Sequence, residues 1–141
     1  MTTTDQEVER ARELREYALK SACDTFQWGK RDCCTFACDW ALLQAGVDPM
    51  ARWRGTYASE TEGRALLAAH GGLLQIWQLG MIEAGIPECD EPRQGDVGII
   101  EALSPAGIEP IGAIFGGKRW LMLSERGVIS ASAKALMHWR I

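Results

Sequence analysis

The stretch Phe26-Gln27-Trp28-Gly29-Lys30-Arg31-Asp32-Cys33-Cys34-Thr35-Phe36 decides the fold. An aromatic pair and a glycine lead to Asp32, which can cap a helix. Apolar residues then recur at intervals of three and four, at Phe36, Ala37, Trp40, Ala41 and Leu43. Gly46 is predicted to end this helix. Cys33 lies in its first turn, where unpaired backbone N–H groups and the helix dipole favour a thiolate, so Cys33 is a candidate nucleophile.

The three cysteines of this helix also have a simpler interpretation. Cys33, Cys34 and Cys38 can be small buried apolar residues, which is how free cysteines usually behave. The chain has five cysteines, an odd number, and no apolar signal segment among its first twenty residues, so free thiols are expected rather than a disulfide framework.

Further helices are predicted on both sides of this segment. Thr4-Asp5-Gln6-Glu7 has the pattern of a capping box before a helix over about 5–22. Ser59-Glu60-Thr61-Glu62 is a second capping box, and its helix should stop near Gly71-Gly72. Leu73 to Ala84 reads as another helix, closed by Gly85.

From Asp96 onward, short β-type runs separated by Gly, Ser and Pro replace the helical pattern. These runs are Val97–Ile100, Ile111–Phe115, Trp120–Leu123, Val128–Ser130 and Met137–Ile141. Helices first and strands second favour an α+β fold with helices packed on an antiparallel sheet. A length of 141 residues fits one domain, spanning 1–141.

Composition limits the partners of the protein. The formal net charge is −4 and Lys and Arg are scattered along the chain, so nucleic acid is not an expected partner. No apolar run approaches the ~18 residues needed to cross a bilayer, so membrane insertion is not expected either.

Several segments together resemble the NlpC family of papain-like cell-wall cysteine peptidases. They are the Asp32-Cys33 pair opening an apolar helix, Gly95-Asp96-Val97-Gly98-Ile99-Ile100, and Ile111-Gly112-Ala113-Ile114-Phe115. The pattern Phe-x-Trp-Gly-x-x-Asp-Cys, with Arg54-Gly55-x-Tyr57, Gly71-Gly72 and the closing Trp139-Arg140-Ile141, is similar to a short phage- and prophage-encoded branch found among tail genes. The resemblance covers nearly the whole chain.

The resemblance implies a papain-like, NlpC-type fold with a C-terminal antiparallel sheet or half-barrel. It implies that Cys33 is the nucleophile, that Asp32 caps its helix and that Gly95-Asp96 starts the sheet. Trp28, Gly29 and Cys34 complete the motif, with Cys34-Thr35 standing where the family has Ser-Gly.

The catalytic histidine of that family is missing. Matching Gly112 to the glycine of the family's His-Val-Gly-Ile-Tyr strand places Pro110 at the histidine position. A cysteine peptidase needs a base to activate the thiol and to protonate the leaving amine. His70 precedes Gly71 at a predicted helix end, which indicates capping, and His138 lies in the last strand, so both are doubtful catalytic residues.

Three other features have alternative interpretations. Cys34 and Cys38 share a helix face and could hold a metal, but no Cys-x-x-Cys occurs, so no metal or cofactor is predicted. Most of the tryptophans are expected in the core, but Trp28, Trp53, Trp77 and Trp120 are too many to be buried there together, which indicates a surplus at assembly contacts. Gly116-Gly117-Lys118 is predicted to be a hairpin turn rather than a phosphate loop.

The resemblance and the missing base together predict a structural or assembly protein of a phage tail, at or near the tail tip, on a degenerate peptidase fold. Its partners would be other tail-tip or hub proteins, and its location the virion tail after synthesis in the host cytoplasm. The alternative is an active peptidoglycan peptidase or amidase with Cys33 as nucleophile and His70 or His138 as base. Whether the protein is an enzyme therefore depends on the distance from Cys33 Sγ to an imidazole.

Overall fold

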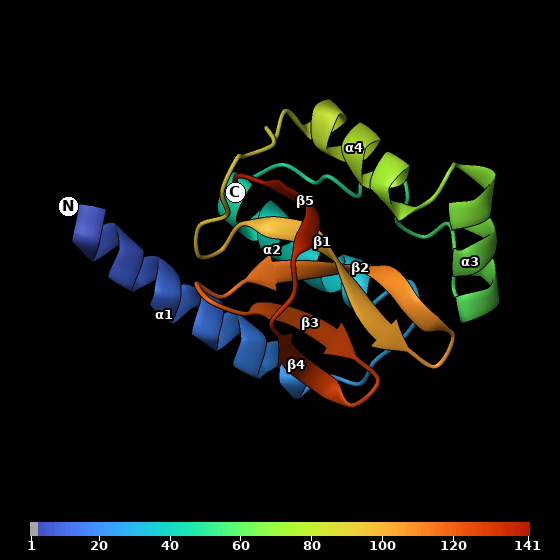
Figure 1. Ribbon diagram of the computed structural model, residues 1–141, viewed down its shortest axis with the longest axis horizontal. Helices are drawn as coiled ribbons and strands as arrows, with labels where there is room; N and C mark the ends of the chain where they lie inside the picture. Colours follow the sequence, from blue (N-terminus) through green and yellow to red (C-terminus); the bar gives the residue numbers. More distant parts are fainter. Residues whose placement is uncertain (1–2) are drawn as a thin grey trace.

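The computed structural model describes residues 3–141, which form four helices followed by a five-stranded antiparallel sheet (Figure 1). The helices are α1 (Thr3–Ala22), α2 (Cys33–Ala45), α3 (Glu60–Ala69) and α4 (Leu73–Ala84). The strands are β1 (Val97–Ser104), β2 (Gly107–Phe115), β3 (Trp120–Ser124), β4 (Gly127–Ala131) and β5 (Ala135–Trp139). The predicted α+β class, with helices before strands, is confirmed.

The sheet is built from hairpins and one return. β1 to β4 follow one another as antiparallel neighbours, and β5 crosses back to pair with β1, giving the order β4-β3-β2-β1-β5. The β2–β3 connection is the hairpin predicted at Gly116-Gly117-Lys118, because Phe115 pairs with Trp120 and the Gly116 N–H donates to the Arg119 carbonyl (2.8 Å). β1 and β2 therefore occupy the centre of the sheet.

The two faces of the sheet bury different apolar groups. Val97, Ile99 and Ile114 belong to the larger core, which they share with α2 and α4, and α2 crosses one face of the sheet in Figure 1. On the other face Ile100, Ala113, Trp120 and Met122 form a smaller cluster. The alternation follows from the two-residue period of a strand. Trp120 of β3 reaches across to Gly98 of β1, where an added Cβ would lie 2.8 Å from its ring.

Two sequence expectations need correction. Thr4 was expected to cap a helix beginning at Asp5, but α1 already includes Thr3 and Thr4, because no proline or glycine interrupts the helix there. The tryptophan surplus is also absent from the surface. Trp53, Trp77 and Trp120 are buried, and Trp28 alone of the four is half-exposed, since two clusters on opposite sheet faces accommodate more aromatic volume than one core would.

The other predicted helix signals hold. Asp32 caps α2 and Gly46 ends it with a left-handed conformation (φ 74°). The Ser59 hydroxyl accepts from the Glu62 N–H (3.1 Å) at the start of α3, and Gly85 (φ 73°) ends α4.

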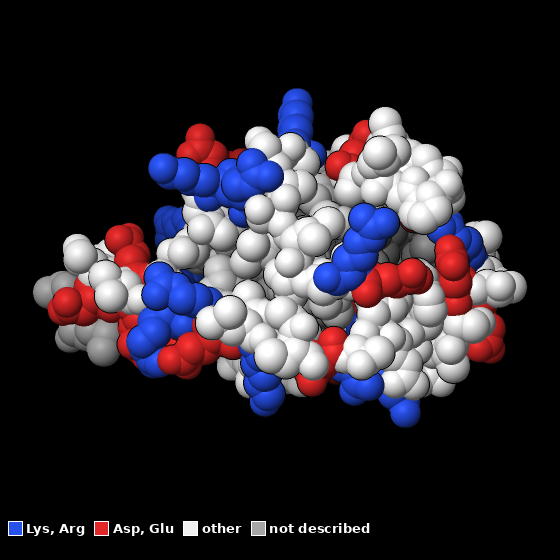
Figure 2. Space-filling view, turned by 90° about the horizontal axis from the view of Figure 1, so that it is seen from below, with Lys and Arg blue, Asp and Glu red and all other residues white. Residues whose placement is uncertain are grey.

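The surface carries charges of both signs. On the face shown in Figure 2, Lys and Arg are interspersed with Asp and Glu and form no continuous basic area. The N-terminal part of α1 extends beyond the sheet (Figure 1).

Within residues 3–141 no single helix has both the length and the apolar character to cross a membrane, and the one helix pair that passes on length and composition, α3 with α4, is bent by 77°.

One buried carboxylate joins distant parts of the chain. Asp96, which is 0 % exposed, accepts from the Arg93 N–H (2.7 Å) and from Arg140 Nε (3.0 Å) through Oδ2, and from the Ile141 N–H (3.0 Å) through Oδ1. Arg10 Nη2 of α1 lies 3.9 Å from Oδ1. Asp96 therefore ties α1, the segment before β1 and the C-terminal residues together.

We predict that Asp96→Ala lowers the free energy of unfolding by about 3–5 kcal/mol, because it leaves buried donors and two arginines without their carboxylate. Urea denaturation measures the change. Asp90→Ala is the matched control, since Asp90 is exposed in the same segment, and should change stability by less than about 0.5 kcal/mol. Equal effects of the two variants would contradict the role assigned to Asp96.

Candidate functional site

The start of α2 is organised by Asp32, which is 1 % exposed. Its Oδ1 accepts from the Thr35 N–H (2.9 Å), while the Thr35 hydroxyl accepts from the Asp32 N–H (2.8 Å). This reciprocal pair is a capping box with threonine in the third position. The predicted cap is confirmed, and Thr35 has a structural role that the sequence did not suggest.

The second oxygen of Asp32 holds two loops. Oδ2 accepts from the Gly29 N–H (2.9 Å) and from the Tyr57 hydroxyl (2.6 Å). Gly29 has φ 84°, and a Cβ there would collide with the Tyr57 carbonyl oxygen, so the position requires glycine. Burial first, and then the nearby Cys34 and Asp32, raise the pKa of Tyr57, so that its hydroxyl remains a donor. Tyr57 is a site residue that the sequence motif contained without indicating its role.

Cys33 is the first residue of α2 and is half-buried. Its carbonyl oxygen would lie 3.3 Å from a Cβ built on Gly112 of β2, and the same Cβ would lie 2.5 Å from the Trp77 ring. Gly112 thus allows α2 and α4 to approach β2 closely. The helix that carries the candidate nucleophile therefore begins directly against the strand to which the resemblance assigns the histidine.

No imidazole accompanies Cys33. Among residues 3–141 neither His70 nor His138 has a ring nitrogen within hydrogen-bonding distance of Cys33 Sγ. His70 is the C-cap residue of α3, and its ring packs edge-on against Trp53 (centroids 4.8 Å apart). Pro110 is exposed on β2, two residues before Gly112 and hence on the same strand face.

His138 lies in β5, the edge strand beyond β1, as its sequence position predicted. Its Nδ1 is 3.2 Å from Cys89 Sγ, a contact that no sequence pattern indicated because 49 residues separate the two. The two histidines therefore lie in separate places, and neither contact involves Cys33.

The other thiols of α2 are poor nucleophiles. A hydrogen bond with Cys33, together with burial, raises the pKa of Cys34, and burial raises the pKa of Cys38. Both thiols therefore keep their protons at neutral pH. Within residues 3–141, no group of three or more His, Cys, Asp or Glu side chains is arranged to hold a metal ion.

Gly95 and Asp96 stand immediately before β1, as the resemblance implied, and they are buried. The Gly95 carbonyl accepts from Trp40 Nε1 of α2 (2.7 Å), and a Cβ on Gly95 would collide with Arg10 Nε. These residues join α1 and α2 to the sheet rather than contacting Cys33.

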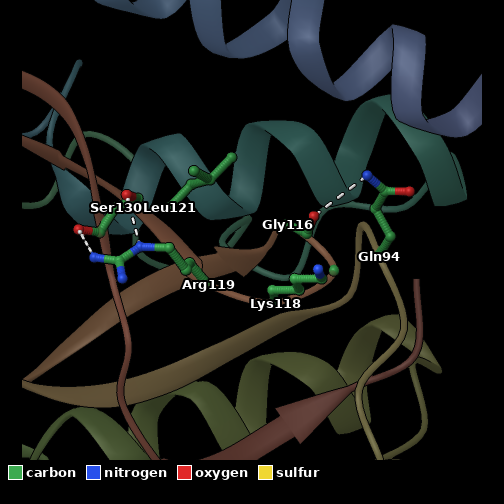
Figure 3. Close-up of a pocket in the computed structure, with 7 residues that line it drawn as sticks. Gln94, Gly116, Lys118, Arg119, Leu121 and Ser130 are labelled. Atoms are coloured by element: carbon green, nitrogen blue, oxygen red, sulfur yellow. Dashed lines mark hydrogen bonds between the residues drawn. The ribbon is translucent and has the colours of Figure 1, made fainter.

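A shallow hollow of about 430 Å³ lies at the β2–β3 turn. Gln94, Lys118 and Arg119 contribute to it (Figure 3), and Arg119 donates to the hydroxyl and carbonyl oxygens of Ser130 on β4. Its lining contains no thiol, imidazole or carboxylate. The hollow therefore offers no thiol to attack a substrate and no imidazole or carboxylate to activate the Ser130 hydroxyl.

The fold and the site define a small α+β protein in which a helix that begins against a central strand carries a half-buried thiol in its first turn, with no imidazole beside it in the described residues. Residues 7–141 match a family described as a domain of unknown function (DUF6950), and the chain belongs to this family. Searches of curated proteins and of solved structures found no match.

The two tyrosine hydroxyls provide a test of the Asp32 network. We predict that Tyr57→Phe lowers the free energy of unfolding by about 2 kcal/mol, because its hydroxyl donates to a buried carboxylate. Tyr17→Phe is the matched control, since Tyr17 donates to the neutral Phe36 carbonyl (2.6 Å), and should lower it by about 1 kcal/mol. Chemical denaturation measures both values. A smaller loss for Tyr57→Phe than for Tyr17→Phe would contradict the proposed importance of the Asp32 contact.

Proposed function

We propose that this protein is a structural or assembly component of a phage tail, at or near the tail tip, on a degenerate NlpC-type papain-like fold. The phage assignment is supported by the sequence resemblance over nearly the whole chain. Other tail-tip or hub proteins are its partners, and the virion tail is its location.

The observation that carries the loss of catalysis is the isolation of Cys33 from both imidazoles. An amide-cleaving thiol needs a group that takes its proton and returns one to the leaving nitrogen. His70 packs on Trp53, His138 contacts Cys89, and Pro110 has no proton to exchange. The start of α2 therefore keeps a cysteine in the nucleophile position but has no imidazole to transfer protons.

An apolar pair at the tip of the β1–β2 hairpin supports a role in assembly. Leu103 and Ile108 are cross-strand partners and are 82 % and 73 % exposed. Figure 1 shows the tip beside α3, to which Arg64 and Glu109 connect it by an ion pair (3.1 Å). Adjacent exposed apolar side chains at a hairpin tip are typical of surfaces that a partner covers.

The proposal is tested in the phage or prophage that encodes the chain. We predict that purified tails contain the protein, and that Cys33→Ala leaves its incorporation and the infectivity of the particles unchanged. The double variant Leu103→Ser, Ile108→Ser should fold but be incorporated at least about tenfold less, because its contact surface is lost. Quantitative mass spectrometry of the particles measures incorporation, and circular dichroism checks folding.

Two results would overturn the proposal. One is the absence of the protein from purified tails. The other is cleavage of a cell-wall peptide by the purified chain that Cys33→Ala abolishes, which would restore the alternative of an active peptidase.

The match between Pro110 and the catalytic histidine of the NlpC peptidases can be tested by placing a base at this position. We predict that Pro110→His raises the rate of Cys33 alkylation by iodoacetamide about tenfold at neutral pH, because an imidazole on that face of β2 can accept the thiol proton. Peptide mapping by mass spectrometry assigns the rate to Cys33. Pro110→Gln, which removes the proline without adding a base, is the control. Equal alkylation rates in the two variants would show that β2 does not correspond to the strand that carries the catalytic histidine in the NlpC peptidases.

A further inference from the structure

A second thiol lies outside the site at α2 and has the imidazole that Cys33 lacks. Cys89 is in the segment between α4 and β1, which runs beside β5. The Cys89 N–H donates to the His138 carbonyl (3.1 Å), and the Arg140 N–H donates to the Pro87 carbonyl (2.9 Å). Glu88 forms a bridge with Trp139. Backbone pairing therefore fixes Cys89 and His138 next to each other.

The side chains of this pair are in direct contact. Cys89 Sγ lies 3.2 Å from His138 Nδ1, and the thiol also donates a long hydrogen bond to Asp96 Oδ2 (3.8 Å). Asp96 is itself held by Arg140 Nε (3.0 Å) and by backbone donors. Both Cys89 and His138 are half-buried rather than enclosed, so a small molecule can reach the sulfur.

Burial contributes most to raising the pKa of Cys89, Asp96 adds to it, and Arg140 opposes it. The thiol is therefore protonated at neutral pH and needs a base in place when it reacts. His138 Nδ1 is the nitrogen base within hydrogen-bonding distance of the sulfur.

An open hollow of about 610 Å³ lies beside the sulfur. Its lining includes Cys89 and Arg140, together with the charged residues Glu88, Asp90, Glu91 and Arg93. The Arg93 guanidinium has no hydrogen-bond or ion-pair partner within residues 3–141, whereas Arg140 is occupied by Asp96 and by the Glu91 carbonyl (2.6 Å). The hollow thus offers one available cation and exposed carboxylates around a thiol.

We propose that Cys89 is a thiol–disulfide exchange site, with His138 as its base, for a low-molecular-weight disulfide that carries both amino and carboxylate groups. Arg93 binds the carboxylate, and the acidic residues of the rim bind the ammonium group. The proposal is independent of the function proposed for the chain.

The exchange step balances without another reactant. The Cys89 S–H proton passes to His138 Nδ1 as the sulfur attacks one sulfur atom of the disulfide. The Cys89 sulfur forms a new S–S bond, the original S–S bond breaks, and the departing thiolate takes the proton from the imidazolium. Cys89 is oxidised to a mixed disulfide, and half of the small disulfide is reduced to a thiol.

The test uses the full chain, reduced and then exposed to cystine at neutral pH, with the adducts assigned by peptide mapping. Cys23 is the internal control, because it is exposed and has no imidazole contact. We expect Cys89 to be modified before Cys23, and Cys89→Ser to remove that first adduct. Faster modification of Cys23 would overturn the proposal.

The pH dependence of the modification rate distinguishes a catalytic base at His138 from a residue that only supports the structure. His138→Gln should slow modification of Cys89 about tenfold at neutral pH and leave the rate at Cys23 unchanged. The difference should shrink at alkaline pH, where the thiol ionises without a base; the charged groups that face the pair are Asp96, Arg140 and, beyond Asp96, Arg10. An unchanged rate at neutral pH, or a deficit that persists at alkaline pH, would exclude His138 as the base.

The ligand class is tested with a second disulfide. Arg93→Gln should slow the reaction with cystine several-fold but not the reaction with the neutral bis(2-hydroxyethyl) disulfide. Equal rates for Arg93→Gln and the unaltered chain with cystine would overturn the assignment of the carboxylate to Arg93.

Discussion

The buried carboxylate of Asp96 is the interaction on which the arrangement of the other parts depends. It receives hydrogen bonds from the residues before β1 and from the C-terminal residues, and it faces Arg10 of α1. A charged group with no exposed surface is stable only when such donors surround it, so these segments are required to meet at one point. Gly95, next to it, admits Arg10 from α1 and accepts from Trp40 of α2. The contacts of Asp96 and Gly95 therefore also hold Cys89 beside β5, and they hold the β1–β2 pair against α2.

A second buried carboxylate, Asp32, joins separate segments in the same way at the start of α2. It caps the helix with one oxygen and anchors Gly29 and Tyr57 with the other. The result is a fixed helix start that carries a half-buried thiol and lies close to β2, the position in which a helix dipole favours a thiolate. What that geometry lacks is a proton acceptor, because the strand offers Pro110 and both imidazoles are engaged elsewhere. The helix start that suits a nucleophile and the imidazoles that could serve as its base therefore lie in different parts of this fold.

Two of the half-buried thiols, Cys33 and Cys89, each have only one of these two features. Cys33 has the helix start but no base, whereas Cys89 lies in an irregular segment and contacts an imidazole. A base matters more than a helix dipole for a thiol whose pKa is raised by burial, because the proton must leave as the sulfur reacts. The reactivity we propose accordingly belongs to Cys89, and the surface of the protein, with its exposed hairpin tip, is what we propose for assembly.

The individual helices and strands could be predicted from local sequence signals. The caps at Asp32 and Ser59, the helix ends at Gly46 and Gly85 and the change to short β runs at Asp96 are near-neighbour effects, and they predicted the helices, the strands and the α+β class. The sequence also predicted Cys33 at a helix start and left it without a base. The contacts between distant side chains, Tyr57 with Asp32 and Cys89 with His138, depend on the folded arrangement and could not be predicted from the sequence. The folded arrangement also buried Trp53, Trp77 and Trp120, although composition had indicated that some of the tryptophans would lie at the surface. The physical reason is range, because caps and periodicity act within a few residues, whereas these contacts join positions that only strand pairing and core packing bring together.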